Sequence, residues 1–263
     1  MLNLPTLPPG STICIIGGGS SGIFAIREAL RVGWVPTLYE QSKSSGGVWR
    51  SDNHWHSLTT NSSMEMMQVS GHPFPFTPSG VFPTRNEICA YIQSFVDKFD
   101  VSPYIQYNTK VVSVRRSTAN NKKQNTRETW NVTTTTSTEQ HTTTNFDIVL
   151  VASGQFNLRK FPSCLQSKSL LLSNFTGTVL HSREFRQGSD YVGKNVLVVG
   201  LGNSSLDVAL ECASAGGAAS VTVACRRGSI ILPIQNDDGT PVDQKIGKFF
   251  TRHEETHHTI TRH

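Results

Sequence analysis

The sequence predicts an α/β protein that contains one structural motif twice: a strand, a glycine turn and a helix. The first copy reads ICIIGGGSSGIFAIREAL over residues 13–30, and the second reads VLVVGLGNSSLDVALEC over residues 196–212. In each copy a short apolar run leads into glycines and then into a helical pattern. Between the copies, residues 109–152 are rich in β-forming residues, which predicts a small antiparallel meander.

Length and composition limit the class of protein. The 263 residues suffice for one large domain or two ordinary ones, and 37% hydrophobic and 16% charged residues are typical of a globular chain. The net charge of +5 comes without a dense basic block, so we expect no nucleic-acid partner. No apolar run approaches the roughly 18 residues of a membrane span, and the N-terminus lacks the pattern of a signal peptide.

Five scattered cysteines without a CxxC pair favour a reducing compartment and buried thiols. We therefore expect a cytoplasmic protein, with peripheral membrane association and homo-oligomerisation both left open. The His-rich end of the chain, residues 249–263, has no spacing typical of a metal site, and no metal is predicted.

The elements before residue 84 begin with an alternation of strand and helix. Residues 12–17 form an apolar strand that runs into glycine, and the following helix ends near Gly33, a residue type typical of a helix C-terminus. A second strand over residues 36–40 ends in an acid, Glu40. Residues 51–83 show little periodicity, and a long ordered loop of that kind is often functional.

A second helix is predicted over residues 84–99, because Thr84 and Glu87 have the spacing of a capping box. Its large apolar side chains recur along one face, as expected for core packing: Ile88, Tyr91, Phe95 and Phe99. The meander follows, with β-forming runs at 109–116, 128–136 and 145–154, the last of which leads back into the main sheet. The segment at 159–163 is a predicted boundary.

The first glycine turn, residues 17–22, fits the pattern GxGxxG of a dinucleotide-binding turn. The first glycine permits a tight turn, the second lets a pyrophosphate approach the backbone, and the third lets the helix pack against the strand. The helix N-terminus offers N–H groups to the phosphates, and an acid about 20 residues on would bind the ribose hydroxyls. This arrangement suits the unphosphorylated ribose of FAD; the alternative for the acid is a solvated strand end. The predicted FAD-binding residues here are Gly17, Gly18, Gly19, Ser20, Ser21, Gly22 and Glu40.

The second glycine turn, residues 200–205, differs from the first in two respects. Ser205 replaces the third glycine, and the next strand ends in two arginines instead of an acid. Guanidinium groups pair well with phosphate oxygens, so this end suits the 2′-phosphate of NADPH; the alternative is a solvated basic strand end. The predicted NADPH-binding residues are Gly200, Gly202, Asn203, Ser204, Ser205, Asp207, Arg226 and Arg227.

Two dinucleotide sites in one chain imply hydride transfer from one cofactor to the other. The predicted fold is therefore α/β with two Rossmann-like domains. We assign residues 1–163, including the meander at 109–145, to an FAD-binding domain, and residues 164–263 to an NADPH-binding domain.

The stretch FTGTVLHSREF at residues 175–185 resembles the fingerprint FxGxxxHxxxY/F of flavin-containing monooxygenases. The related Baeyer–Villiger monooxygenases usually have Trp at the position of Phe185. Three further segments resemble motifs of the first family: GGVWR at 46–50, LTTNSSMEMM at 58–67 and DIVLVASGQFN at 147–157. Met64 and Ser153 depart from the family's usual lysine and threonine. The resemblance extends from Ile13 to about Pro233, with the motifs in the family's order.

The resemblance implies a flavin-dependent monooxygenase that uses FAD, NADPH and O2. Its substrate would be a small soft nucleophile, oxygenated at an amine nitrogen or a sulfide sulfur through a flavin C4a-hydroperoxide. It also implies that Gly47, Val48 and Trp49 lie beside the flavin, that Thr60 and Asn61 belong to the cofactor site, and that Asn61 is catalytic. Considered without the resemblance, Asn61 is an ordinary turn residue.

Family members are normally much longer, so the second domain is expected to be incomplete. Two alternatives remain open on the sequence. One is a non-catalytic or degenerate dinucleotide-binding remnant, and the other is a Baeyer–Villiger or N-hydroxylating relative.

Overall fold

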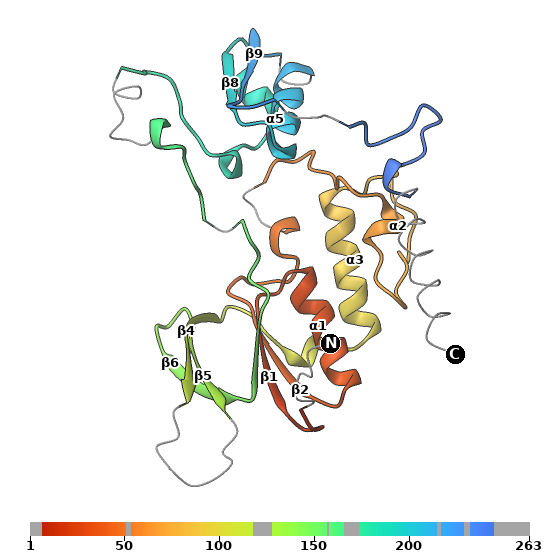
Figure 1. The fold of residues 1–263 in the computed structure, drawn as a ribbon, viewed down its shortest axis with the longest axis vertical. Helices are drawn as coiled ribbons and strands as arrows, with labels where there is room; N and C mark the ends of the chain where they lie inside the picture. Colours follow the sequence, from red (N-terminus) through yellow and green to blue (C-terminus); the bar gives the residue numbers. More distant parts are fainter. Residues whose placement is uncertain are drawn as a thin grey trace, which may run out of the picture. The chain divides into compact units, whose positions relative to one another are not determined.

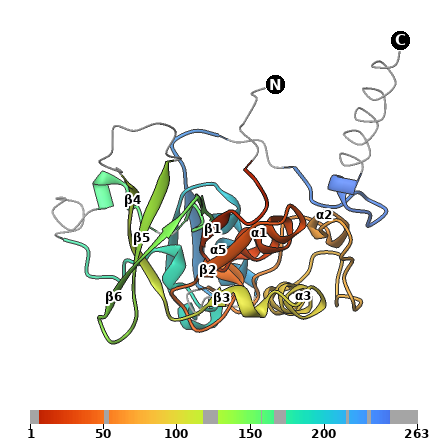
Figure 2. The ribbon, with the colours of Figure 1, turned by 90° about the horizontal axis from the view of Figure 1, so that it is seen from below.

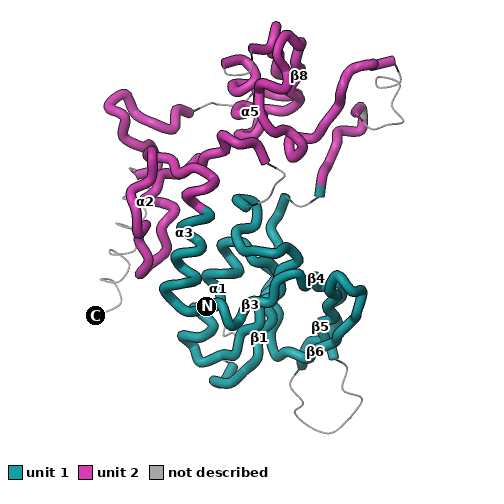
Figure 3. The backbone as a smooth tube through the Cα atoms, turned by 180° about the vertical axis from the view of Figure 1, so that it is seen from behind, with its two compact units in different colours: residues 1–51, 89–158 teal, residues 52–88, 159–263 magenta. Residues whose placement is uncertain are grey.

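The computed structural model describes residues 7–50, 54–117, 128–156, 158–165, 174–214, 217–228 and 232–244. The chain forms two compact units, which are coloured teal and magenta in Figure 3. The first unit comprises residues 1–51 and 89–158, and the second comprises residues 52–88 and 159–263.

The centre of the first unit is a four-stranded parallel sheet with the order β3-β2-β1-β7. Figure 1 labels its strands β1 and β2. Its strands are β1 Thr12–Ile16, β2 Val35–Tyr39, β3 Ile105–Gln106 and β7 Ile148–Val151. In β1, Ile15 pairs with Leu38 on one side and Leu150 on the other. The sequence of β1, TICII, is almost entirely apolar, which is typical of a central strand that is buried on both faces.

Helix α1, Ser20–Arg31, follows the first glycine turn and buries Ile23 and Ile26. Helix α3, Arg85–Lys98, lies beside α1 (Figure 2). The rings of Phe24 and Phe95 lie 4.7 Å apart between the two helices. The predicted capping box of α3 is confirmed. The Thr84 N–H donates to the Glu87 carboxylate at 2.7 Å, and the Glu87 N–H donates to the Thr84 hydroxyl at 3.3 Å.

The meander is a three-stranded antiparallel sheet made of β4 Lys110–Ser117, β5 Thr129–Thr135 and β6 His141–Phe146. Its apolar side packs on the main sheet, with Val132 and Phe146 against Cys14 and Tyr39. The predicted β-run at 145–154 is in fact divided between two sheets. The break is at Asp147, whose carboxylate accepts hydrogen bonds from the Thr12 N–H and hydroxyl at 2.8 and 3.0 Å.

The second unit contains the parallel pair β8 Asn195–Val199 and β9 Ser220–Ala224, joined by helix α5 Asn203–Ser214. Alternate residues of β8 pack toward α5, where Val208 and Cys212 form a core with Trp55 and Phe185. Short elements among the described residues include α2 Met64–Met67 and the 3-10 turns η1 Gly47–Trp49, η2 Ser102–Tyr104, η3 Ser163–Leu165, η4 Ser182–Glu184 and η5 Gly188–Tyr191.

The predicted α/β class, with two strand–turn–helix motifs and an antiparallel meander, is confirmed. Proximity in space groups residues 52–88 with the second unit, a long-range association that no local sequence pattern signals. The assignment of residues 1–163 and 164–263 to FAD and NADPH stays a prediction. The His-rich end at 249–263 lies outside the described residues. Within the described part of the chain, no helix is both long and apolar enough to cross a membrane.

Candidate cofactor sites

The first glycine turn is tightly packed against its own unit. Gly17 has a φ of +108°, and a Cβ there would lie 2.6 Å from the Ala152 carbonyl oxygen. A Cβ on Gly22 would lie 1.9 Å from the Gly17 carbonyl oxygen, which leaves no room for any side chain. Gly17 is therefore required by its backbone conformation and Gly22 by the close approach of the helix to the turn, as expected of a GxGxxG sequence.

The N-terminus of α1 opens directly from this turn. Gly19 is the N-cap residue, and no side chain caps the helix. Among the described residues, none accepts a hydrogen bond from the N–H groups of Ser20, Ser21 or Gly22. These unpaired N–H groups and the positive end of the helix dipole favour an anion at this position.

A second glycine loop, which the sequence predicted only as a separate motif, lies against the first turn. The Gly46 N–H donates to the Gly18 carbonyl oxygen at 2.9 Å. Gly47 has a φ of +55°, and a Cβ on it would lie 2.9 Å from the Cα of Gly19. Val48 is exposed and Trp49 is half-buried beside them. The backbones at Gly18–Gly19 and Gly46–Gly47 therefore lie against each other, next to the uncapped N-terminus of α1.

Glu40, directly after β2, is almost completely buried at 9% exposure. Its carboxylate accepts hydrogen bonds from the Gly18 N–H at 2.5 Å, the Ser42 N–H at 2.8 Å and the Ser42 hydroxyl at 2.7 Å. This geometry excludes the alternative of a solvated acid. A carboxylate has about four acceptor positions, so room is left for a further donor such as a ribose hydroxyl. Sequence reasoning missed Ser42, although its place two residues after the acid permits the contact.

The second glycine turn is more open than the first. Gly200 has a φ of +125°, and a Cβ on Gly202 would meet no atom within 4 Å. Ser205, in the place of a third glycine, turns its hydroxyl back to the Gly202 carbonyl oxygen at 2.6 Å. Asn203 and Ser204 are exposed at the start of α5. Asp207 is half-buried, and burial followed by the nearby charge of Glu211 raises the pKa of its carboxyl.

Arg226 and Arg227 are exposed beyond the end of β9. Neither makes an ion pair with an acid in the part of the chain that the structure describes. Their position, past the strand that follows α5, is the one predicted for recognition of a 2′-phosphate. Two guanidinium groups without an acidic partner remain available for an anion.

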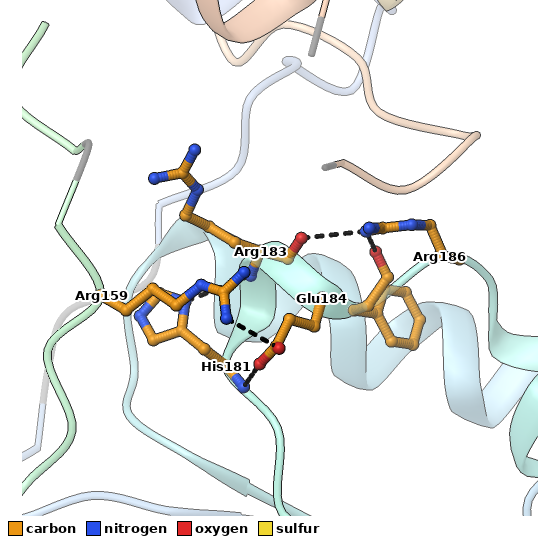
Figure 4. A network of polar contacts seen from close by, with 6 residues as sticks. Arg159, His181, Arg183, Glu184 and Arg186 are labelled. Carbon is orange, nitrogen blue, oxygen red and sulfur yellow. Dashed lines mark hydrogen bonds and ion pairs between the residues drawn. The ribbon is translucent and has the colours of Figure 1, made fainter. Parts of the chain in front are cut away.

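The fingerprint stretch at 175–185 makes structural contacts (Figure 4). The His181 Nδ1 accepts a hydrogen bond from the Arg183 N–H at 3.2 Å, and the Glu184 carboxylate accepts from the His181 N–H at 2.9 Å and from Arg159 at 2.8 Å. The hydrogen bond from the His181 backbone, followed by the charge of Arg159, lowers the pKa of Glu184. Phe185 is buried against Trp55 and stacks on Tyr191. These contacts join His181, Glu184 and Phe185 to neighbouring parts of the second unit.

Thr60 and Asn61 lie in the second unit and have different environments. Thr60 is buried, with its N–H bonded to the Pro83 carbonyl oxygen at 2.9 Å and its hydroxyl to the Ser62 carbonyl oxygen at 2.7 Å. Asn61 is exposed, and its side chain has no hydrogen-bond partner among the described residues. Of these two side chains, the amide of Asn61 is therefore the one that is free to contact a bound molecule.

The predicted site residues thus form two groups. The first unit brings together the turn at 17–22, Glu40 and the loop at 47–49, and the second unit contains Thr60, Asn61 and the residues between Gly200 and Arg227. Within the described residues, no cluster of histidine, cysteine or acidic side chains could hold a metal ion. Binding of FAD and NADPH by these residues stays a prediction.

A family model and the relatives found by sequence comparison point to the same family of proteins. A family model described as flavin-binding monooxygenase-like matches residues 10–257. Flavin-containing monooxygenase 3 of Canis lupus familiaris is 34% identical over 253 residues, which are 93% of this chain and 45% of that protein. The chain therefore spans less than half the length of this relative.

Solved structures share the fold. S-allyl-L-cysteine S-oxygenase from Allium sativum has a TM-score of 0.69 at 22% identity, over 87% of this chain and 54% of that chain. The OTEMO complex with FAD and NADP has a TM-score of 0.65 at 19% identity, over 89% of this chain and 43% of that chain. A family model that matches nearly the whole chain, and a relative at 34% identity, establish that this chain belongs to the flavin-containing monooxygenase family.

Proposed function

We propose that this chain acts in a flavin-dependent monooxygenase, binding FAD at the first glycine turn and NADPH at the second. The reaction consumes O2 and oxygenates a small soft nucleophile at an amine nitrogen or a sulfide sulfur. The observation that carries the proposal is the buried Glu40 beside an uncapped helix N-terminus and two glycine loops. The S-oxygenase among the structural neighbours supports the sulfur substrate as one of the two classes.

The first site fits FAD by its donors and acceptors. The unpaired N–H groups of Ser20 and Ser21 would hold the pyrophosphate at the positive end of α1. The Glu40 carboxylate, already fixed by Gly18 and Ser42, would accept a ribose hydroxyl. Because the carboxylate is fixed before the cofactor arrives, little ordering is needed on binding.

The second site fits NADPH by its charge. Gly202 has open space on its side-chain face, so a pyrophosphate could approach the backbone of the turn. Arg226 and Arg227 would pair with the 2′-phosphate that distinguishes NADPH from NADH.

When bound, the two cofactors supply the hydride and the oxygen activation, and this chain supplies orientation and exclusion of water. Asn61 is the proposed catalytic side chain, because its amide is exposed and can donate a hydrogen bond without supplying an acidic proton. An amide of this kind can orient the cofactor and the activated oxygen without promoting the loss of peroxide.

The first test is the visible absorption spectrum of the purified chain before and after addition of FAD, followed by NADPH oxidation with amine and sulfide substrates. About one flavin per chain, with substrate-dependent consumption of NADPH, would support the proposal. A chain that neither carries nor takes up flavin would instead support a non-catalytic remnant. Lactone or ester formation from ketones would identify a Baeyer–Villiger relative.

The substitution Asn61→Ala tests the catalytic assignment. We expect flavin content to be unchanged, while oxygenated product per NADPH consumed falls about tenfold and hydrogen peroxide takes its place. The control Asn145→Ala changes an exposed asparagine in the meander and should leave coupling intact. Equal coupling in the Asn61→Ala variant and the control would refute the catalytic role of Asn61.

A further inference from the structure

The segment that leads to Asn61 shares an anchor with the helix of the second glycine turn. The Glu211 carboxylate, in the C-terminal half of α5, accepts a hydrogen bond from the Ser57 hydroxyl at Oε2 and from the Gly188 N–H at Oε1, the latter at 3.1 Å. Ser57 lies 154 positions before Glu211 in the sequence. One carboxylate therefore holds two separate loops on α5.

Neighbouring contacts in the same unit support this anchor. The Trp55 ring packs edge to face on Phe185 with centroids 6.4 Å apart, and the His56 N–H donates to the Arg186 carbonyl oxygen at 3.0 Å. Gly188 approaches α5 so closely that a Cβ on it would lie 2.3 Å from the Glu211 carbonyl oxygen. Residues 55–57 are thus held by packing, by a backbone hydrogen bond and by Glu211.

The chain on either side of Asn61 is also fixed within the second unit. The Thr60 N–H bonds to the Pro83 carbonyl oxygen, and the Ser63 N–H donates to the Asp243 carboxylate at 2.6 Å. Asn61 therefore lies between two anchored backbone positions. Its amide is presented from a fixed segment, and the fixed segment is tied to α5.

Glu211 is electrostatically unfavourable for α5 itself. Burial and the charge of Glu211 raise the pKa of Asp207, one helical turn earlier, and burial and the same charge raise the pKa of the adjacent Cys212. A carboxylate near a helix C-terminus also opposes the helix dipole. Stability of the isolated helix does not explain an acid here, whereas its two hydrogen bonds to loops do.

We infer that Glu211 is a positioning residue that fastens the Asn61 segment to α5, so that Asn61 is carried by the same unit as the second glycine turn. The inference rests on the proposed function only for the catalytic role of Asn61. It predicts that occupation of the second turn orders residues 54–61, since the Ser57–Glu211 hydrogen bond and the packing of Trp55 against α5 hold helix and segment together.

Hydrogen exchange of backbone amides, followed by mass spectrometry, tests the anchor without any cofactor. In Glu211→Ala, we expect amides at 54–61 to exchange about tenfold faster, while those of β8 and α5 keep their protection. Ser57→Ala should give the same change in smaller measure, Glu211→Gln should restore part of the protection, and Glu139→Gln in the meander should change nothing. Unchanged exchange at 54–61, or faster exchange throughout the second unit, would overturn the inference.

The same measurement with NADP⁺ separates the inference from the proposed function. Protection at both 196–206 and 54–61 in the wild-type chain, with only the latter lost in Glu211→Ala, supports the inference. Protection at 196–206 alone in the wild-type chain overturns it. If NADP⁺ protects neither segment, the proposed NADPH site is overturned. The role of Glu211 is then decided by the comparison of the wild-type chain with Glu211→Ala in the absence of cofactor.

Discussion

The two glycine turns have the same local plan and very different surroundings. The first is flanked by four parallel strands, a second glycine loop and a buried acid, and a side chain on Gly22 would meet the backbone. The second follows one of two described parallel strands, and the other face of β8 leaves Leu197 62% exposed. A motif of this kind therefore sets the path of the backbone, whereas the packing around it determines whether the site is formed before its ligand arrives.

The largest difference should appear on substitution of a turn glycine by alanine. Gly22→Ala places a methyl group 1.9 Å from the Gly17 carbonyl oxygen, so the turn must open, and we expect a loss of about 4 kcal/mol or more with no flavin retained. Gly202→Ala meets no atom within 4 Å and should keep the fold and the flavin. Urea unfolding and flavin content measure both effects. Similar stabilities for the two variants would remove the contrast between the turns.

Thiol reactivity gives a second contrast, because a cysteine lies near each turn. Cys14 in β1 is fully buried, and burial raises its pKa to about 12, whereas Cys225 just after β9 is exposed. In the native chain at pH 8, iodoacetamide should label Cys225 at least about a hundredfold faster than Cys14. In urea the two rates should converge. Peptide mass spectrometry measures both rates, and rapid native labelling of Cys14 would contradict the tight packing of the first unit.

The choice between NADPH and NADH should depend on Arg226 and Arg227 in the second unit and not on Glu40 in the first. Arg226→Ala combined with Arg227→Ala removes the two guanidinium groups beyond the end of β9, so the preference for NADPH over NADH should fall about ten- to a hundredfold. Flavin content should not change, because Glu40 lies in the other unit. Steady-state kinetics with both nucleotides measure the ratio, with Lys194→Ala as an exposed control in the same unit. A preference that survives the double substitution would refute the phosphate assignment.

The smallest expected effect concerns charge on the two helices. In α1, hydrogen bonds from Arg31 and Arg27 lower the pKa of Glu28, whereas in α5 burial and Glu211 raise the pKa of Asp207. A raised pKa means that ionised Asp207 destabilises the fold, an effect absent below pH 4 and developed once the pH exceeds the folded-state value. Asp207→Asn should therefore stabilise the chain by about 0.5 kcal/mol at pH 7.5 and by nothing at pH 3.5.

Thermal unfolding at the two pH values checks this sign. Equal stabilisation at both would mean that the charge of Asp207 is irrelevant and that the amide acts by packing. Glu28→Gln on α1 provides the opposite control, because it removes a carboxylate that is paired with arginines. That variant should be slightly destabilised at pH 7.5 and unaffected at low pH.

Local features were predictable from the sequence, because they depend on residues close together in the chain. Both strand–turn–helix motifs, the Thr84–Glu87 capping box and the positive φ of Gly17 and Gly200 follow from short-range sterics and hydrogen bonding. The meander followed from alternation and turn chemistry in the same way.

Tertiary structure alone decided which of these local features meet. Contacts between Gly46 and Gly18, between Trp55 and Phe185, and between Ser57 and Glu211 join positions that no periodicity connects. The same holds for Asp147, which divides a continuous β-run between two sheets by accepting hydrogen bonds from Thr12. Such contacts are selected by the burial of whole elements, which depends on the complete packing of each unit and not on any one stretch of its sequence.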